Sequence, residues 1–449
     1  MTRGKKKETL TPEERLQTAL VPESEQPYKV PRNWCWTYLT KGAAECLDSF
    51  RKPINASERS NREGDIPYYG ATGQVGWIDD FLTNEQLVLL GEDGAPFLDL
   101  IKDKAYIIEG KAWVNNHAHI LQSHFGTVGN LFLMHYLNVF NYNDFVNGTT
   151  RLKLTQSSMD TMPVPIPPLP EQQRIVDRIE SLFAKLDEAK QKAQNALDSF
   201  ETRKAALLHK AFTGELTAQW RKEHGVGMES WEKANLGNYV DSQYGYTESA
   251  SQEQVGPKFL RITDIQDGVV NWTDVPFCKI SDTDFERYAV SQNDIMIART
   301  GATTGKSYLI VDNVKAVFAS YLIRIKIKSP KLQPQYLYGF MQSQMYWGQI
   351  TEFSAGIAQP GVNAKKLKEI ILSIPSIPEQ TEIVRILDDL LSKEQQAKEA
   401  AEKVLEQIDL IKKAILARAF RGELGTNNPN EESAVKLLET YFNVSVTVI

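Results

Sequence analysis

Two long stretches of the chain repeat apolar residues at alternating steps of three and four. In the first stretch these are Ile175, Ile179, Leu182, Leu186, Ala189, Ala193, Ala196 and Phe200. In the second they are Ile383, Leu387, Leu390, Ala397, Ala401, Val404, Ile408, Ile411 and Ile415, with Glu394 as a polar residue on the same line. A spacing that averages 3.5 residues is typical of helices that pair in a left-handed coiled coil. Both stretches are therefore predicted to be long helices with a narrow apolar stripe.

The two stretches are copies of one sequence. Residues 166–216 align with residues 374–424 at a constant offset of 208, and about 21 of the 51 aligned positions are identical. The shared marks are Pro170-Glu171-Gln172 with Pro378-Glu379-Gln380, and Ala-Phe-x-Gly-Glu-Leu at 211–216 and 419–424. The prolines suit a first helical turn, and Gly214 and Gly422 suit a helix end. Each copy predicts a helix of about 42 residues, on the order of 60 Å long.

A narrow apolar stripe with many alanines needs a second surface to cover it. Because the two stripes share one register, we expect the two helices to pair with each other as an antiparallel coiled coil. The alternative is that each helix packs against its own globular domain.

A globular segment precedes each helix. Trp34 lies 137 residues before Glu171, and Trp231 lies 148 residues before Glu379. Both segments contain short β-branched and aromatic runs broken by Gly, Asn and Asp, which predicts strands joined by tight turns. Strand-like runs lie at 105–114, 293–301, 306–311 and 321–328, and helices are expected at 129–141 and 334–350.

The order globular–helix–globular–helix predicts an α+β chain, in which a mixed α/β domain and a long helix occur twice with pseudo-twofold symmetry. The expected divisions are an N-terminal arm 1–30, a first domain 31–169, a first helix 170–216, a linker 217–230, a second domain 231–374, a second helix 375–424 and a tail 425–449. Within the tail, residues 434–449 predict a short helix and then a strand in which Val444, Val446 and Val448 alternate.

Composition excludes several classes of protein. The 449 residues are 42% hydrophobic and 24% charged, values typical of a globular chain of several domains. No stretch approaches 18 uninterrupted apolar residues, and the charged N-terminus lacks the apolar core of a secretory signal. Cys35, Cys46 and Cys278 are too few for a disulfide framework, which favours a reducing cytoplasm. The net charge of −6 still permits a local basic face.

Two motifs resemble catalytic or nucleotide-binding sites only loosely. GATTGKS at 301–307 has three residues between its glycines, where the ATP-binding loop needs four, and a strand-like run follows it. A turn between two strands is the better prediction, with Arg299, Thr300, Thr303, Thr304 and Lys306 as donors toward DNA. Asp99 with Glu109-Gly-Lys111 resembles the acidic set of metal-dependent nucleases, but a strand edge with a solvated lysine is expected there.

The histidines and the search for cofactor motifs give no evidence of a metal or cofactor site either. His117 and His119 would share one strand face, but no cysteine or carboxylate stands out nearby as a partner for zinc, so core or DNA-facing roles and no metal site are expected. The Asn/Asp-Pro-Pro-aromatic motif that holds a flipped base is missing, as are a Gly-rich cofactor loop and helicase-type ATP motifs. The sequence therefore contains no recognisable catalytic motif.

Together these features resemble the specificity subunits of type I restriction-modification enzymes. The resemblance covers about residues 30–424 and rests on the repeated helices, the domain order, and the segments 64–79, 110–121 and 299–307, which look like variable target-recognition domains. It implies a DNA-recognition subunit with no catalytic site, whose two domains read the halves of a bipartite, asymmetric target. The implied partners are double-stranded DNA, two modification (methyltransferase) subunits and the restriction subunits, with no membrane. S-adenosylmethionine, ATP and Mg²⁺ are expected on those partner subunits, and no cofactor is expected in this chain.

Base edges are read by forked donors and acceptors, so polar turns supply the candidate contacts. In the first domain the candidates are Tyr68, Tyr69, Thr72, Gln74 and His117. In the second they are Tyr244, Tyr246, Arg299, Thr303, Lys306, Gln359 and Asn363. Partner-subunit or helix-end contacts are expected from Glu171, Gln172, Phe212, Glu215, Leu216, Glu379, Gln380, Phe420, Glu423 and Leu424. The alternatives are that several of these only stabilise turns, and that the chain is a self-contained DNA nuclease or methyltransferase, or a coiled-coil scaffold that does not touch DNA.

Overall fold

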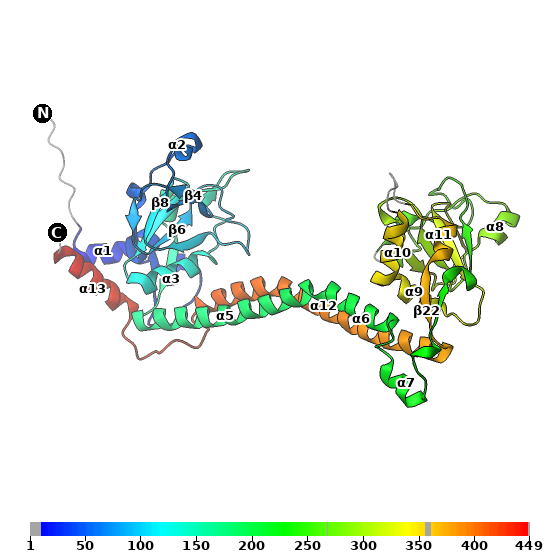
Figure 1. The fold of residues 1–449 in the computed structure, drawn as a ribbon. Helices are drawn as coiled ribbons and strands as arrows, with labels where there is room; N and C mark the ends of the chain where they lie inside the picture. Colours follow the sequence, from blue (N-terminus) through cyan, green and yellow to red (C-terminus); the bar gives the residue numbers. More distant parts are fainter. Residues whose placement is uncertain (1–9, 267, 355–360, 448–449) are drawn as a thin grey trace. The chain divides into compact units, whose positions relative to one another are not determined.

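The computed structural model describes residues 10–266, 268–354 and 361–447 (Figure 1). The chain forms two compact units, residues 1–194 with 403–449, and residues 195–402. Each unit contains one globular domain and the parts of the long helices that pack against it (Figure 1). No helix in the described ranges has the length and apolar character needed to cross a membrane.

The first domain is built on an antiparallel sheet with the strand order β2-β9-β6-β7. These strands are β2 (Ala44–Cys46), β9 (Ala118–Ser123), β6 (Leu87–Gly91) and β7 (Ala105–Ile108), and helix α3 (Gly126–Leu137) follows β9 and packs on the sheet. A second sheet has the order β4-β3-β8-β5, from β4 (Gly73–Ile78), β3 (Ile66–Gly70), β8 (Lys111–Val114) and β5 (Thr83–Asn84). The smaller elements are α2 (Ala56–Ser60), β10 (Val146–Asn147), β11 (Lys153–Leu154) and α4 (Gln156–Met159).

The second domain repeats the main sheet of the first, in the order β14-β21-β18-β19. These strands are β14 (Val240–Tyr244), β21 (Leu322–Ile327), β18 (Ile295–Ala298) and β19 (Ser307–Leu309), and helix α9 (Pro334–Met341) follows β21 as α3 follows β9. The remaining elements are β15 (Lys258–Leu260), β16 (Ile265–Gln266), β17 (Val269–Val270), α8 (Asp282–Tyr288), β20 (Ala316–Phe318), α10 (Gln344–Ser354) and α11 (Ala364–Glu369). The predicted strands lie within these sheets, and GATTGKS forms the turn between β18 and β19 as expected.

A two-stranded ribbon closes each domain at the point where its helix begins. In the first domain β1 (Cys35–Tyr38) pairs antiparallel with β12 (Pro163–Ile166), and helix α5 starts at Leu169. In the second, β13 (Glu232–Asn235) pairs with β22 (Ile371–Ile374), and helix α12 starts at Ile377. Pro170 and Pro378 therefore lie in the first helical turn, as predicted.

The two repeated helices differ in continuity, which corrects the expectation of two equal helices. Helix α12 runs unbroken over Ile377–Ala419, whereas the first copy is divided into α5 (Leu169–Asp198) and α6 (Phe200–Phe212) at Ser199. The Ser199 hydroxyl donates to the carbonyl oxygens of Asn195 (2.8 Å) and Ala196 (3.2 Å). A hydroxyl that bonds back to the preceding turn competes with the helical hydrogen bonds and breaks or bends the helix.

The helices pair antiparallel within each unit. In the first unit Lys190 contacts Asp409 (3.4 Å) and Lys412 contacts Asp187 (2.6 Å), so residue numbers rise along α5 as they fall along α12. In the second unit the Arg203 guanidinium contacts Glu394 (2.8 Å) between α6 and α12. The expected pairing is therefore confirmed.

Each helix end also packs on a globular domain. Phe420 meets the rings of Phe132 and Tyr136 of the first domain, at centroid distances of 5.1 and 5.2 Å. Phe212 meets Tyr336 and Phe340 of the second domain, at 5.3 and 5.6 Å. Helix pairing and packing on the domains, which the sequence posed as alternatives, thus occur together.

Two expectations about helices were wrong. The tail forms one helix, α13 (Ala434–Thr447), where a valine strand was predicted to follow a short helix; Val448 lies outside the described residues. Ala434, Leu438 and Phe442 recur every four residues and are buried, and α13 packs on α1 (Pro12–Ala19), so burial of this face overrides the β preference of valine. The helix expected at 334–350 is interrupted after Met341. The Ser343 hydroxyl donates to the Phe340 carbonyl oxygen (2.7 Å), and α10 begins at Gln344.

Candidate functional site

A buried glutamate fixes the first turn of α5 to the start of its own domain. The side chain of Glu171 is fully buried and accepts hydrogen bonds from the Trp34 indole N–H (2.8 Å) and the Asn427 amide (2.8 Å). Trp34 lies just before β1, and Asn427 lies in the segment between the end of α12 and α13. One carboxylate therefore joins the domain, its helix and the C-terminal segment.

The second unit repeats this arrangement with a different third partner. Glu379 is fully buried and accepts from the Trp231 indole N–H (3.0 Å), the Thr217 hydroxyl (2.7 Å) and Arg221 (2.6 Å). Thr217 and Arg221 belong to the linker that carries α7 (Ala218–His224). The linker thus holds Glu379 as the tail holds Glu171.

The neighbouring glutamines complete the helix ends. Gln172 donates to the Pro167 carbonyl oxygen (3.1 Å), and Gln380 donates to the Pro375 carbonyl oxygen (2.8 Å) and accepts from the Gln333 backbone N–H (2.8 Å). The buried members of the predicted helix-end set are Glu171, Gln172, Phe212, Glu379, Gln380 and Phe420. Their side chains make internal contacts and present no surface to a partner subunit. Glu215 and Glu423 are exposed, and Leu216 and Leu424 are half-buried.

The candidate contacts of the first domain fall into two groups. Tyr68 is buried, with 2% of its surface exposed, in a cluster with Trp113, so it serves the core and its predicted role in base contact is wrong. Tyr69 packs against Tyr106 (5.9 Å), while Thr72 and Gln74 are exposed at the β3–β4 hairpin.

His117 lies on another loop but is tied to the same region. Its backbone N–H donates to the Asn115 side chain (2.8 Å), and the Asn115 N–H donates to the Tyr69 carbonyl oxygen (3.1 Å). The His117 ring lies 3.5 Å from Asp93, with 40% of its side chain exposed.

The structure brings three candidates of the second domain together. The Arg299 guanidinium lies over the Tyr244 ring at 4.9 Å, and the Tyr244 hydroxyl accepts from the Ala364 backbone N–H (3.1 Å). Asn363 caps α11, because its side-chain oxygen accepts from the Lys366 backbone N–H (2.9 Å).

The other candidates lie around this cluster. Thr303 and Lys306 close the β18–β19 turn through a backbone hydrogen bond (2.9 Å), with Lys306 exposed. Tyr246 is half-buried against Tyr288 (5.3 Å). Gln359 lies outside the described residues.

A set of loop contacts in the first domain forms what we call the shared loop frame. Strand β6 is followed by Glu92, Asp93 and Gly94, and Gly94 has a positive φ of 76°. The Glu92 backbone N–H donates to the His117 carbonyl oxygen (2.8 Å), and its carbonyl oxygen accepts from the Leu154 N–H (2.8 Å). Asp93 forms a β-bridge with Lys153, and Thr155 then caps a helix by accepting from the Ser158 N–H (3.2 Å).

The second domain contains the same frame. Strand β18 is followed by Arg299, Thr300 and Gly301, and Gly301 has a φ of 78°. The Arg299 N–H donates to the Tyr321 carbonyl oxygen (3.1 Å), and its carbonyl oxygen accepts from the Val362 N–H (2.9 Å). Thr300 forms a β-bridge with Gly361, and Asn363 caps the helix that follows. The backbone is therefore conserved between the two domains while nearly every side chain on it differs.

The charges of the frame differ most. Counting on from the ends of the paired strands, the first domain has Asp48 and Glu92 at the positions of Tyr244 and Arg299. Arg51 lies between these two carboxylates and pairs with both, at 2.8 Å from Asp48, and Lys153 contacts Glu92 at 3.2 Å. The first domain therefore has two carboxylates bridged by a cation where the second domain has an arginine stacked on a tyrosine.

Asp48, Glu92 and the buried His119 also offer ligand atoms within 4.8 Å of one another. The expectation that no carboxylate lies near the histidines is therefore wrong. Burial raises the pKa of Asp48, but the hydrogen bond and charge of His119 and the charge of Arg51 outweigh it and lower the pKa below its usual value. Burial also raises the pKa of Glu92, and Arg51, His119 and Lys153 outweigh it in the same way. Arg51 thus pairs with both carboxylates, and Lys153 pairs with Glu92.

Sequence reasoning missed three exposed side chains that lie on the frame or are ion-paired to it. Tyr321 of the second domain is 62% exposed, and Arg151 and Lys153 of the first have side chains 61% and 52% exposed. One signal was present in the sequence: each of β6 and β18 is an apolar run followed by a glycine three residues after the strand ends. Aligning the domains on that pattern places Glu92-Asp93-Gly94 on Arg299-Thr300-Gly301.

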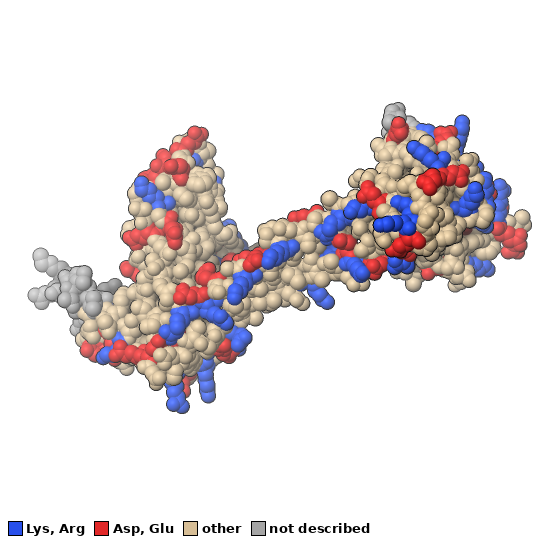
Figure 2. Space-filling view, turned by 60° about the horizontal axis from the view of Figure 1, so that its bottom comes forward, with Lys and Arg blue, Asp and Glu red and all other residues tan. Residues whose placement is uncertain are grey.

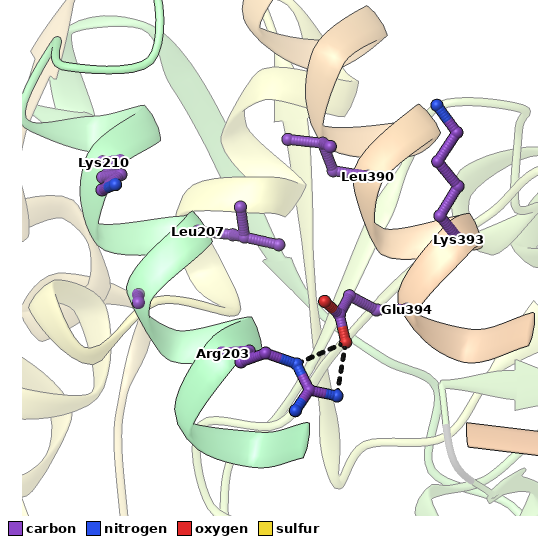
Figure 3. Close-up of a pocket in the computed structure, with 7 residues that line it drawn as sticks. Arg203, Leu207, Lys210, Leu390, Lys393 and Glu394 are labelled. Atoms are coloured by element: carbon purple, nitrogen blue, oxygen red, sulfur yellow. Dashed lines mark hydrogen bonds and ion pairs between the residues drawn. The ribbon is translucent and has the colours of Figure 1, made fainter. Parts of the chain in front are cut away.

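The helix pair of the second unit carries a shallow groove of about 330 Å³ (Figure 3). Leu207 and Leu390 line it from α6 and α12, and the Arg203–Glu394 ion pair crosses it (Figure 3). The first unit has Ile411 and Leu186 at the positions that correspond to Arg203 and Glu394 by the repeat offset. On the face drawn in Figure 2, Lys and Arg alternate with Asp and Glu on both units.

The fold defines a duplicated chain in which two domains share one loop frame and are held on repeated helices. Comparison with known proteins identifies the family. The sequence profile described as the type I restriction modification DNA specificity domain matches residues 45–198 and 228–407. The chain belongs to this family.

Individual relatives and a solved structure agree with this family assignment. The EcoBI specificity subunit of Escherichia coli is 27% identical over 327 residues, 68% of each chain. The putative specificity subunit S.HindORF215P of Haemophilus influenzae is 27% identical over 367 residues, 77% of this chain and 84% of the relative. The solved HsdS subunit of Thermoanaerobacter tengcongensis superimposes with a TM-score of 0.62 at 18% identity, over 89% of this chain and 100% of that one. The relatives are specificity subunits, and the structural match supports the fold.

Proposed function

We propose that the chain is the DNA-recognition subunit of a type I restriction-modification complex and reads a bipartite, asymmetric target. The observation that carries this proposal is the shared loop frame, which occurs once in each domain with different side chains. A common backbone can dock against DNA in the same way, while different side chains read different bases. The two half-sites are therefore expected to differ in sequence.

The paired helices are proposed to set the distance between the half-sites and to dock two modification subunits. The groove beside Leu207 and Leu390 offers apolar surface flanked by Lys210 and Lys393, which suits an amphipathic partner helix. The restriction subunits complete the proposed complex. S-adenosylmethionine, ATP and Mg²⁺ are expected on these partner subunits, and the chain itself is proposed to be non-catalytic and cytoplasmic.

Arg299 provides the test of DNA reading in the second domain. The full chain, assembled with its modification subunits, is titrated with duplexes that carry or lack the target defined by methylated adenines. Arg299→Ala is expected to weaken target binding by about 1–3 kcal/mol and to relax one position of the second half-site. Arg287→Ala is the control, because Arg287 also stacks on a tyrosine of that domain (5.5 Å) but lies on α8, outside the frame.

The alternatives predict other results. Binding to no duplex, even by the assembled complex, would favour a coiled-coil scaffold. Cleavage or methylation by the purified chain alone would favour a self-contained enzyme.

A further inference from the structure

We propose that Arg151 and Lys153 are DNA contacts of the first domain, with Arg151 reading a base edge and Lys153 binding a phosphate. This inference rests on the proposed function and adds the residues of the first half-site that the sequence did not reveal. It follows from the position of Lys153 on the shared loop frame and from the ion pair of Arg151 with Asp93 of that frame.

The position of Lys153 is set by backbone contacts. Lys153 forms a β-bridge with Asp93 as Gly361 does with Thr300, and the residue after each one donates its N–H back to the frame. Arg151 precedes Lys153 by two residues, as Gln359 precedes Gly361, so Arg151 corresponds in sequence to Gln359. Gln359 is predicted to contact DNA in the second domain. His117 corresponds to Tyr321, since each gives its carbonyl oxygen to the first residue after the strand.

The side chains are arranged with the cations outermost. Arg151 and Lys153 are 61% and 52% exposed, whereas their partners Asp93 and Glu92 are 25% and 13% exposed. The acidic groups therefore lie beneath the cations and hold them in place, and the surface itself presents positive groups to a polyanion.

Arg151 is oriented but keeps donors for a ligand. Its Nε lies 2.6 Å from Asp93, and its two amino groups make no hydrogen bond to any residue in the described part of the chain. A guanidinium held on one side presents the remaining fork to a planar pair of acceptors, which matches the O6 and N7 atoms of guanine.

Gly94 makes room for this arrangement. A Cβ atom at Gly94 would lie 3.1 Å from the Arg151 Nε, and its φ of 76° disfavours any other residue.

The test uses the complete complex of the full chain with its modification subunits. The probe is a duplex that carries the target mapped from methylated adenines, together with single-base variants of the first half-site. Arg151→Ala is expected to lower affinity by about 5- to 150-fold and to relax one position of that half-site, with an unchanged salt dependence. Arg151→Lys retains the charge without the fork and should relax the same position. Lys153→Ala should weaken all duplexes evenly and reduce the salt slope by about one.

Arg62→Ala is the matched control, because Arg62 is also ion-paired to an aspartate (Asp79, 2.6 Å) in the same domain but lies outside the frame. If Arg151→Ala behaves like this control while the domain remains folded, the inference is wrong. An even loss of affinity with a flatter salt dependence would make Arg151 a phosphate contact and overturn its role in reading a base. Failure of the wild-type complex to bind the target would instead overturn the proposed function.

Discussion

The indole N–H of Trp34 donates a 2.8 Å hydrogen bond to the buried carboxylate of Glu171, across 137 residues of chain. Trp231 and Glu379 form the same bond at 3.0 Å across 148 residues. Each tryptophan fastens the start of a domain to the first turn of the helix that leaves it. The repeat therefore preserves the joint between domain and helix, while the surfaces on the domains differ.

The two joints should respond differently to loss of charge. Glu379→Gln leaves Arg221, whose side chain is 8% exposed, without its anion, and a buried charge that loses its partner typically costs about 3–5 kcal/mol. Glu171→Gln removes a carboxylate whose hydrogen-bond donors are neutral, so a loss nearer 1–2 kcal/mol is expected. Chemical denaturation followed by hydrogen exchange in each unit measures both. Equal losses would show that Arg221 does not depend on Glu379.

The polar pair in the helix seam should contribute little stability. Arg203 and Glu394 are 38% and 23% exposed, and exposed ion pairs typically contribute at most about 1 kcal/mol. Changing them together to Ile and Leu, the residues at the corresponding positions 411 and 186, should raise the melting temperature of the second unit. Each single change should lower the melting temperature slightly. A double-mutant cycle measures the coupling free energy between Arg203 and Glu394. A strongly destabilised double variant would show that the seam requires the ion pair.

Acid should weaken the contact between the terminal helix and the first domain. The His124 ring stacks on Tyr441 of α13 at 4.1 Å, and burial, aided by the charge of Arg15, lowers the pKa of His124 to about 4. Lys41, Glu45, Cys46 and Asp160 line the same cavity. Because the unfolded histidine titrates near 6.5, the unfolded state binds more protons between the two values. The stability contributed by burying the neutral His124 is therefore fully present above about pH 6.5. It is lost as the pH falls toward 4, and this loss is on the order of 3 kcal/mol at most.

Hydrogen exchange of α13 between pH 7 and pH 4.5, corrected for the intrinsic rate, follows this loss. His124→Phe keeps a ring against Tyr441 and should abolish that part of the pH dependence. A pH dependence that persists unchanged in this variant would assign it to other groups.

The helices could be predicted from sequence because their determinants are local. A spacing of 3.5 residues, a proline at the start and a glycine at the end specify each copy without knowledge of the rest of the chain. The break at Ser199 was missed because a single hydroxyl causes it inside an otherwise regular pattern.

The contact surface could not be predicted in the same way. The shared loop frame joins Glu92 to His117 and Leu154, and Arg299 to Tyr321 and Val362, so its members lie up to about 60 residues apart. Local patterns also cannot separate two tyrosines in one strand, although Tyr68 is core and Tyr69 lies on the opposite face.

The spacing between half-sites should follow the length of the helices. Inserting four residues after Gln194 and four after Glu402 adds about one turn, roughly 6 Å, to each helix of the pair. The non-specific spacer of the target is expected to lengthen by about two base pairs, since the rise of DNA is about 3.4 Å per base pair. The half-site bases should stay the same. A spacer that does not change would contradict the role of the helices as a ruler.

Sequencing that detects methylated adenines across a host genome tests the central claim most directly. The host carries the complex with the wild-type chain, or with residues 231–374 replaced by the corresponding domain of another family member. The wild-type chain should give one bipartite, non-palindromic motif with methylated adenine in each half. The exchanged chain should keep the first half of that motif and acquire a new second half. A motif that changes in both halves, or methylation that does not depend on this chain, would contradict the account.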